Sequence, residues 1–209
     1  MGPRHELAGM SNVEVIQADA LQLDLAHHMR GETFRVVANI PYQITSHLLR
    51  RLMETPAAPD RVVLTLQAEV VDRIVAAAGE MSLLALSIQV YGAPRRMAEI
   101  PAGAFFPVPQ VDSAVLRIDR HPSPVIPADL IPLFFRLARA GFQQRRKQLR
   151  NSLASGFGIP AADASSLLAR AEIRPDRRAQ ELTLEDWERL ARCLTFATGK
   201  EPASAEPAV

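Results

Sequence analysis

Hydrophobic positions in the first 120 residues follow strand-like and helix-like spacings in turn. Runs that are continuously apolar, or that alternate with a period of two, are typical of β-strands. Because Phe34–Ile40 is almost entirely apolar, its pattern predicts a strand covered on both faces. The runs with strand-like patterns are Asn12–Gln17, Phe34–Ile40, Arg61–Leu66 and Val111–Ile118.

Helical spacing separates these predicted strands. Thr45–Met53 places its leucines on one side of a helix, and Ala68–Ala78 has a similar pattern. Met81–Tyr91 begins with helical spacing and passes into a strand around residues 89–91. The resulting βαβα order, with closing strands, is typical of a doubly wound α/β sheet.

Beyond residue 121 the strand-like patterns stop. His121–Pro127 has three prolines in seven residues and predicts a linker. We therefore expect an α/β domain over residues 1–121 and a small all-α domain over residues 122–209. The predicted helices of the second domain are Ala128–Leu153, Pro160–Ala171 and Thr183–Phe196.

The long predicted helix Ala128–Leu153 has an apolar face and a basic flank. Its large apolar side chains fall within about 40° of one another at helical spacing. Arg139, Arg146 and Arg150 form the adjacent flank of the same helix. The residues of the apolar face are Phe135, Phe142, Leu149 and Leu153.

The last predicted helix begins with a recognisable cap. Thr183 followed by Asp186 has the spacing of a capping box, with Asp in place of the usual Glu. We expect Trp187 and Cys193 to pack between helices. Residues 199–209 are rich in Ala, Pro and Glu, which predicts a frayed end.

The composition is that of an ordinary globular protein. Of 209 residues, 48% are hydrophobic and 22% are charged, which excludes collagen-like, low-complexity and wholly disordered chains. No stretch approaches the roughly 20 apolar residues of a membrane helix, and the first residues lack the apolar core of a secretory signal. The single cysteine, Cys193, excludes an internal disulfide and a cysteine-based metal site. We therefore expect a cytoplasmic protein without a metal ion or a membrane contact.

The net charge of +1 conceals an uneven distribution. Residues 1–121 have 11 basic and 13 acidic side chains, whereas residues 122–209 have 13 basic and 10 acidic ones. The excess is concentrated in one acid-free stretch, which is a candidate contact for RNA phosphates. A solvated helix face is the alternative interpretation. The basic residues of this stretch are Arg139, Arg145, Arg146, Lys147 and Arg150.

Asn39-Ile40-Pro41-Tyr42 follows a predicted apolar strand, where ligands bind in open α/β sheets. Methylation of an exocyclic adenine amine needs acceptors for both amino hydrogens, and the Asn39 side chain and the carbonyl before Pro41 are suitable. Pro41 stiffens the turn, and Tyr42 offers a stacking face for a base taken out of its helix. No strong general base is needed, because catalysis rests on positioning. The alternative is a strand that ends in a proline turn with a half-buried tyrosine.

Two further segments are candidates for ligand contacts. The prolines of Phe105–Ser113 fix an extended segment, so Phe105 is a candidate for the opposite wall of a base-stacking slot. Asp19 and Ala20 follow the first predicted strand, and a carboxylate there can accept from a cofactor's adenine amino group. The alternatives are a core phenylalanine beside a rigid loop and an aspartate that caps the next element.

The order and spacing of these motifs resemble those of one family, the bacterial small-subunit (16S) rRNA adenine N6,N6-dimethyltransferases. The resemblance extends from about Asn12 to Phe196, and its last two motifs together are specific. The large-subunit rRNA methyltransferases of macrolide resistance share the Asn-Pro-Tyr and Phe-Pro-Pro elements but are not expected to share the Gln-Arg-Arg-Lys helix. The matching motifs are Asp19, Asn39–Tyr42, Leu66–Val70, Phe105–Ser113 and Phe142–Leu153.

The resemblance implies a Rossmann-like methyltransferase sheet followed by a small all-α domain. It implies S-adenosylmethionine as methyl donor and two adjacent adenosines near the 3′ end of 16S rRNA, in the immature 30S subunit, as substrate. It places Asn39, Pro41, Tyr42 and Phe105 around the target adenine. Asp19, Ala20 and Asn39 would contact the cofactor, and the basic stretch of the helical domain would contact rRNA. We expect a monomer.

The sequence departs from the family pattern at several positions. Ala68 and Gln110 stand where the family often has lysine. At the front, the family has a Glu-x-Gly-x-Gly loop and a strand that ends in an acidic residue, and neither is present here. These elements would surround the methionine and ribose of the cofactor. We therefore expect the 209-residue chain to bind S-adenosylmethionine poorly, an expectation that micromolar binding in a calorimetric titration would overturn.

Two other functions stay open at the level of sequence. A non-catalytic RNA-binding or ribosome-assembly factor, or an inactive fragment without the cofactor loop, would keep the helical domain. A methyltransferase of another substrate is the second alternative, because similar Asn-Pro-Pro-Tyr turns serve DNA adenines and protein glutamines. The basic helix and the Phe-x-Pro-x-Pro segment argue against the latter.

Overall fold

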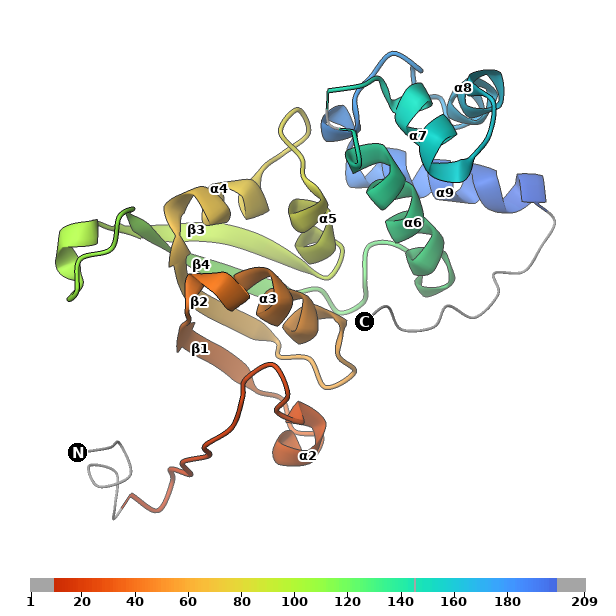
Figure 1. The fold of residues 1–209 in the computed structure, drawn as a ribbon. Helices are drawn as coiled ribbons and strands as arrows, with labels where there is room; N and C mark the ends of the chain where they lie inside the picture. Colours follow the sequence, from red (N-terminus) through yellow and green to blue (C-terminus); the bar gives the residue numbers. More distant parts are fainter. Residues whose placement is uncertain (1–9, 145, 199–209) are drawn as a thin grey trace.

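A four-stranded mixed sheet forms the centre of the first part of the chain (Figure 1). The computed structural model describes residues 10–144 and 146–198. The strand order is β1-β2-β4-β3, in which β1 and β2 are parallel and the other neighbours are antiparallel. The strands are β1 (Arg35–Asn39), β2 (Arg61–Gln67), β3 (Gly92–Ile100) and β4 (Ser113–Arg120).

Helices α3 (Thr45–Glu54), α4 (Ala68–Val75) and α5 (Leu83–Gln89) pack on one face of this sheet (Figure 1). Side chains alternate along β2 between buried and half-buried, so one face of the strand forms the core. The leucines of α3 lie in this core, as their spacing predicts. A short helix, α2 (Leu25–Met29), precedes β1.

The predicted βαβα order is confirmed from residue 34 onward. The strand predicted around residues 89–91 is wrong, because α5 continues to Gln89 and a turn follows at residues 90–91. The strand β3 starts at Gly92, in a segment for which the sequence predicted no strand. A Cβ atom on Gly92 would lie 2.8 Å from the Ile118 side chain and 2.9 Å from the Asp119 carbonyl. The glycine therefore allows β3 to enter closely against β4.

The strand predicted at Asn12–Gln17 is wrong. No residue of this segment lies in a strand, and its apolar side chains Val13 and Ile16 are 41% and 43% exposed. A strand needs a neighbour for its backbone N–H and C=O groups, and none of the described strands pairs with this segment.

The prediction that the strand at Phe34–Ile40 is covered on both faces is wrong as well. Val37 is 79% exposed, whereas its neighbours Val36 and Ala38 are half-buried. Within the described ranges, β1 pairs only with β2, so it is an edge strand with one face toward solvent. Continuous apolar character therefore does not show how many faces of a strand are covered.

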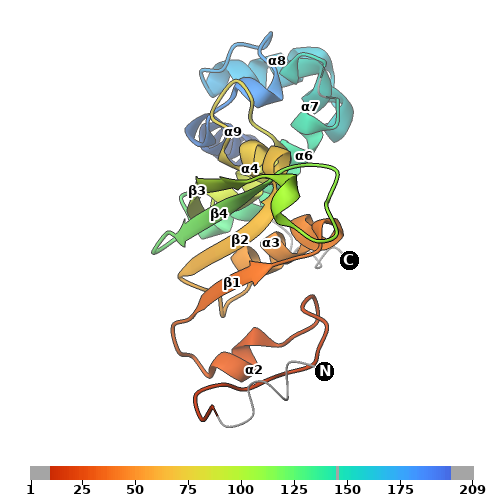
Figure 2. The same cartoon turned by 90° about the vertical axis from the view of Figure 1, so that its left-hand side faces the viewer.

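The second part of the chain is helical, as predicted, and lies at one end of the molecule, while α2 lies beyond β1 toward the other (Figure 2). The segment 121–127 joins it to β4 and bonds back through the Val125 N–H to the Val90 carbonyl. Its elements are η3 (Ala128–Leu130), α6 (Ile131–Phe142), α7 (Leu149–Phe157), α8 (Ala161–Arg170), η4 (Ala179–Glu181) and α9 (Leu184–Thr198).

The single helix predicted over Ala128–Leu153 is wrong, because a turn separates α6 from α7. Gln148 has an extended backbone (φ −62°, ψ 146°), and the N–H of Leu149 donates to the Arg177 carbonyl at 2.7 Å. A tertiary hydrogen bond thus replaces the helical one that the local pattern predicts. As a result, Arg139, Arg146 and Arg150 do not share one helix flank.

Trp187 on α9 packs between helices, as predicted. It is fully buried, and its ring lies 6.0 Å from that of Phe142 on α6. The chain approaches this ring closely, because a Cβ on Gly141 would lie 2.6 Å from a Trp187 ring carbon. The predicted capping box is also confirmed, since the Thr183 and Asp186 side chains each accept from the other residue's N–H.

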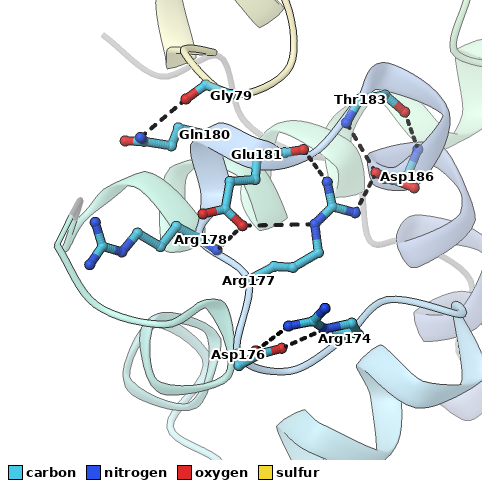
Figure 3. A network of polar contacts seen from close by, with 9 residues as sticks. All are labelled: Gly79, Arg174, Asp176, Arg177, Arg178, Gln180, Glu181, Thr183 and Asp186. Carbon is cyan, nitrogen blue, oxygen red and sulfur yellow. Dashed lines mark hydrogen bonds and ion pairs between the residues drawn. The ribbon is translucent and has the colours of Figure 1, made fainter.

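A short set of hydrogen bonds joins the two parts of the chain. The Gln180 carbonyl of η4 accepts from the N–H groups of Gly79 and Met81, which lie between α4 and α5. The Gln180 side chain donates to the Gly79 carbonyl at 3.1 Å (Figure 3). These bonds fix the α4–α5 loop against the helical part.

The residues next to Gln180 in η4 belong to a charged cluster. Arg177 contacts Asp186 at 3.0 Å and also donates to the Glu181 carbonyl (Figure 3). Asp186 is buried and receives a second guanidinium, from Arg189. Buried carboxylates are stable when they are paired and hydrogen-bonded in this way.

None of the helices in the described ranges combines the length and the apolar character needed to cross a membrane.

Candidate functional site

The turn after β1 presents the first candidate residues. Asn39 is the last residue of β1, is exposed, and has a side chain with no hydrogen-bond partner in the described part of the chain. Pro41 holds an extended conformation (φ −57°, ψ 133°) and leads into the turn η1 (Tyr42–Ile44). The Asn39 amide is therefore available to a ligand at the end of the strand.

The loop between β3 and β4 presents the second set of residues. It contains the turn η2 (Ala102–Ala104) and the segment that begins at Phe105. The Asp112 carboxylate accepts from the Ala102 N–H at 2.8 Å, and its carbonyl accepts from the Ala68 N–H at the start of α4. Asp112 thus ties the two ends of the loop to each other and to α4.

The two loops meet in a cavity of about 290 Å³. The structure therefore brings together the four residues that the sequence places around a base, namely Asn39, Pro41, Tyr42 and Phe105. The cavity is lined by Asn39, Ile40, Pro41, Tyr42, Gln43, Phe105, Phe106, Pro107 and Pro109.

Tyr42 is held in place by a residue to which sequence reasoning assigned no role. Its hydroxyl lies 2.8 Å from the Ser113 hydroxyl in a hydrogen bond. Ser113 is fully buried at the start of β4, so the bond joins the turn after β1 to the sheet. The Phe-x-Pro-x-Pro-x-Val-Asp-Ser motif contains Ser113, but the spacing alone does not indicate its partner.

The two phenylalanines at the mouth of the cavity differ in burial. Phe105 is half-buried, whereas Phe106 is fully exposed. A large apolar side chain exposed beside a cavity is a candidate contact for a ligand. Sequence reasoning missed Phe106, because only the first phenylalanine matches the family motif.

The bond between Tyr42 and Ser113 leads to a stability prediction. We expect Tyr42→Phe to lower the free energy of unfolding by about 1 kcal/mol, because it leaves the buried Ser113 hydroxyl without its partner. Urea unfolding measures this change. Tyr91→Phe is a matched control, since Tyr91 is buried but forms no side-chain hydrogen bond in the described residues. Equal losses in the two variants would show that the bond does not stabilise the turn.

The proposed cofactor contact at Asp19 is not part of this cavity. The Asp19 carboxylate accepts from the Leu21 N–H at 2.9 Å and from the Gln22 side chain at 3.2 Å. Asp19 thus caps its own turn, which is the alternative that the sequence left open. Ala20 lies in the same turn, and a cofactor role for either residue stays a prediction.

The predicted RNA-contacting residues are spread over several elements. Arg139 is on α6, Arg146 and Lys147 are in the turn that follows, and Arg150 is on α7; Arg145 lies outside the described residues. The four described side chains are exposed. Arg146 and Lys147 line a shallow depression with Gln143 and Gln144.

The family and the fold follow from comparisons with known proteins. A family model described as "Ribosomal RNA adenine dimethylase" matches residues 3–195. Two proteins named ribosomal RNA small subunit methyltransferase A, from two strains of Dehalococcoides mccartyi, are 40% and 42% identical over 186 and 191 residues. These alignments cover 88% and 90% of the chain but only 63% and 65% of the relatives. The chain thus spans just under two thirds of their length.

Two solved structures have the same fold. A dimethyladenosine transferase from Plasmodium falciparum aligns with a TM-score of 0.74 at 21% identity, over 94% of this chain and 77% of that one. The 23S rRNA methyltransferase ErmE aligns with a TM-score of 0.69 at 24% identity, over 91% and 75%. The expected Rossmann-like methyltransferase fold with a helical part is confirmed.

Proposed function

Because this chain belongs to the ribosomal RNA adenine dimethylase family, we propose that it methylates N6 of two adjacent adenosines near the 3′ end of 16S rRNA, with S-adenosylmethionine as methyl donor. One observation carries the proposal. The cavity of about 290 Å³ joins Asn39 and Tyr42 from one loop to Phe105 from another. An exposed amide beside aromatic walls suits a planar base that carries an amino group.

The chemistry of the amine explains these residues. The N6 lone pair is delocalised into the adenine ring, so the amine must be held with its lone pair toward the methyl group. The Asn39 side-chain oxygen and the Ile40 carbonyl accept the two amino hydrogens, while Tyr42 and Phe105 stack on the ring. The amine gains acidity as the N–C bond forms, so its proton passes to solvent without a strong base. Positioning supplies the catalysis.

One described residue, Asn39, is placed where it can lie near the methyl group of S-adenosylmethionine. S-adenosylmethionine, when bound, supplies an electrophilic methyl group on sulfur. Asn39 stands at the carboxyl end of a parallel strand, where such ligands bind, and its amide has no protein partner in the described part of the chain. Asp19 is exposed but already bonded within its turn, so it would have to exchange the Gln22 contact for the cofactor's adenine.

The proposed partner is the immature 30S subunit, and the proposed location follows from it, since bacterial ribosomes are assembled in the cytoplasm. We propose a monomer, and that the exposed cations Arg139, Arg146, Lys147 and Arg150 contact RNA phosphates.

Primer extension tests the proposed reaction. Under-methylated 30S subunits are incubated with the chain and S-adenosylmethionine, and reverse transcription is run across the 3′ end of 16S rRNA. We expect new stops at two adjacent adenosines. Binding to 30S subunits without new stops would support the alternative of a non-catalytic assembly factor.

The exposed cations Arg146 and Lys147, in the turn before α7, and Arg150, on α7, lead to a binding prediction. We expect Arg146→Ala with Arg150→Ala to weaken RNA binding and to reduce the slope of log K against log salt by about one to two. The reason is that a protein with fewer phosphate contacts releases fewer counterions from the RNA when it binds. RNA titrations at several salt concentrations measure the slope. Arg95→Ala with Arg170→Ala is the matched control, because both are exposed and form no ion pair in the described residues. Equal slopes in both double variants would show that Arg146 and Arg150 face solvent and do not contact RNA phosphates.

A further inference from the structure

Phe106 stands at the rim of the cavity that Tyr42 and Phe105 line, which has a volume of about 290 Å³. We refer to this cavity as the base cavity. The side chain of Phe106 is 101% exposed, so no side chain in the described ranges covers its ring. Phenylalanine is among the residues most often fully buried, because burial removes a large apolar area from water. Phe106 therefore has no packing role in the core of the described fold.

The backbone turns Phe106 away from the preceding phenylalanine. Phe105 has an extended conformation (φ −112°, ψ 152°). In extended backbone, successive side chains point to opposite sides. For this reason Phe105 is half-buried, whereas Phe106 faces solvent. The two rings are thus placed to contact two different groups of one ligand.

The loop that carries Phe106 is anchored at both ends. The Asp112 carboxylate accepts from the Ala102 N–H at 2.8 Å, and the Asp112 carbonyl accepts from the Ala68 N–H at 3.0 Å. Within the loop, the Phe105 N–H donates to the Ala102 carbonyl at 3.1 Å. The backbone at Phe106 is therefore positioned before any ligand binds. A ring that is positioned in advance loses less conformational entropy on binding.

The surface around Phe106 is apolar and contains no cation. Val108 and Val111 are exposed on the same loop. Residues 101–113 contain no Lys, Arg or His, and Asp112 is their one charged residue. The loop, lime green in Figure 1, projects from the end of the sheet that lies away from the helical part. Such a surface does not attract a phosphate through charge, but it suits the flat face of a base.

Placing an adenine in the base cavity opens a gap in the RNA. The target must leave its stack to reach Asn39, and the bases on either side then expose apolar faces to water. Proteins that unstack bases commonly insert an apolar side chain, such as phenylalanine, at the opened step. An exposed aromatic ring at the rim of the cavity lies beside the place where this gap forms.

We propose that Phe106 stacks on the RNA base next to the target adenine and thereby takes the target's place in the base stack. The proposal rests on the proposed function, since it assigns a further residue to that site. Tyr42 and Phe105 enclose the target, whereas Phe106 stabilises the RNA that the target has left. Phe106 thus favours the unstacked state of the target and takes no part in the transfer of the methyl group.

The test measures base unstacking and RNA affinity of the full 209-residue chain without the cofactor. The probe is a 3′-terminal 16S rRNA fragment with 2-aminopurine in place of one target adenosine, because the fluorescence of this base rises when it leaves the stack. Two further fragments lack the base on one side or the other of the probe. Phe106→Ala removes the ring, and Phe106→Tyr keeps it. Val108→Ala is the matched control, because Val108 is exposed on the same loop but does not line the base cavity.

We expect Phe106→Ala to bind the complete fragment about 5-fold more weakly and to lose most of the rise in fluorescence. Phe106→Tyr and Val108→Ala are expected to stay close to the unchanged chain. On one of the two fragments that lack a neighbouring base, Phe106→Ala and the unchanged chain are expected to bind equally, because the ring has lost its partner. Circular dichroism checks that the variants are folded, as the full exposure of Phe106 leads us to expect.

Equal affinity and fluorescence for Phe106→Ala and the unchanged chain would overturn the proposal. A loss of the same size on all three fragments would overturn it as well, as would failure of the unchanged chain to bind the RNA. A loss with whole 30S subunits but not with the RNA would replace it by a protein contact. Methylation is scored separately by primer extension. A rise in fluorescence that depends on Phe106, in a chain that does not methylate, would uphold the stacking contact and reject the proposed reaction.

Discussion

Asn39→Ala is expected to lower the rate of methyl transfer by about 100-fold or more and to leave RNA affinity nearly unchanged. The Asn39 amide is exposed, lines the cavity of about 290 Å³ with Tyr42 and Phe105, and has no protein partner in the described residues. Its removal leaves one amino hydrogen of the target base without an acceptor, so the lone pair is no longer held toward the methyl group. RNA affinity depends on phosphate contacts far more than on this one bond.

Two measurements separate these effects. Methyl incorporation into under-methylated 30S subunits gives the rate, in whichever form of the protein is active, and RNA titration gives the affinity. Asn12→Ala is the matched control, because Asn12 is an exposed asparagine outside the cavity. An unchanged rate of methyl transfer in Asn39→Ala would show that the Asn39 side chain has no role in the mechanism. An equal loss of rate and affinity would make Asn39 a binding residue.

Trp187→Ala is expected to lower the free energy of unfolding by about 3–5 kcal/mol. Trp187 is fully buried, and its ring packs against Phe142 and the backbone at Gly141. The alanine variant loses the transfer free energy of the indole and leaves a cavity between α6 and α9. Since whole domains are stable by only about 5–15 kcal/mol, this loss is large.

Urea unfolding of the unchanged chain and two variants measures this effect. Trp187→Phe is the control, because the indole Nε1 has no hydrogen-bond partner in the described residues, so only volume is lost. We expect its cost to be well below that of alanine, at about 1–2 kcal/mol. A cost below about 1 kcal/mol for Trp187→Ala would mean that the helical part repacks around the missing ring.

Local patterns predict most elements of this fold. The leucine spacing in Thr45–Met53 and the apolar run Arg61–Leu66 both correspond to observed elements, α3 and β2. These predictions succeed because a helix or strand that packs one face needs a fixed hydrophobic period. The hydrophobic period gives a wrong prediction where the structure depends on which distant segments pair with a strand or cover its faces. Asn12–Gln17 alternates like a strand but has no paired neighbour in the described chain, and β1 is apolar although one face is exposed.

For the candidate site too, the sequence predicts some features and the tertiary structure decides the others. The sequence alone determines the residue types, since an asparagine, a proline and a tyrosine after a strand fit the chemistry of an exocyclic amine. Only the tertiary structure decides that Phe105 lies across the cavity from them and that Ser113 holds Tyr42, because these contacts join segments more than 60 residues apart.

The sequence by itself determined the family motifs, the helix and strand order after residue 34, and the excess of positive charge in the last third. The tertiary structure decided where that charge lies. Helix α6 ends at Phe142, and at the start of α7 the Leu149 N–H donates to the Arg177 carbonyl instead of continuing a helix, so Arg139 is separated from Arg146 and Arg150. Arg139 instead lines a cavity together with Arg73, which precedes it by 66 residues. Spacing along a chain encodes local periodicity, whereas the meeting of distant cations depends on how the packed elements bring them together.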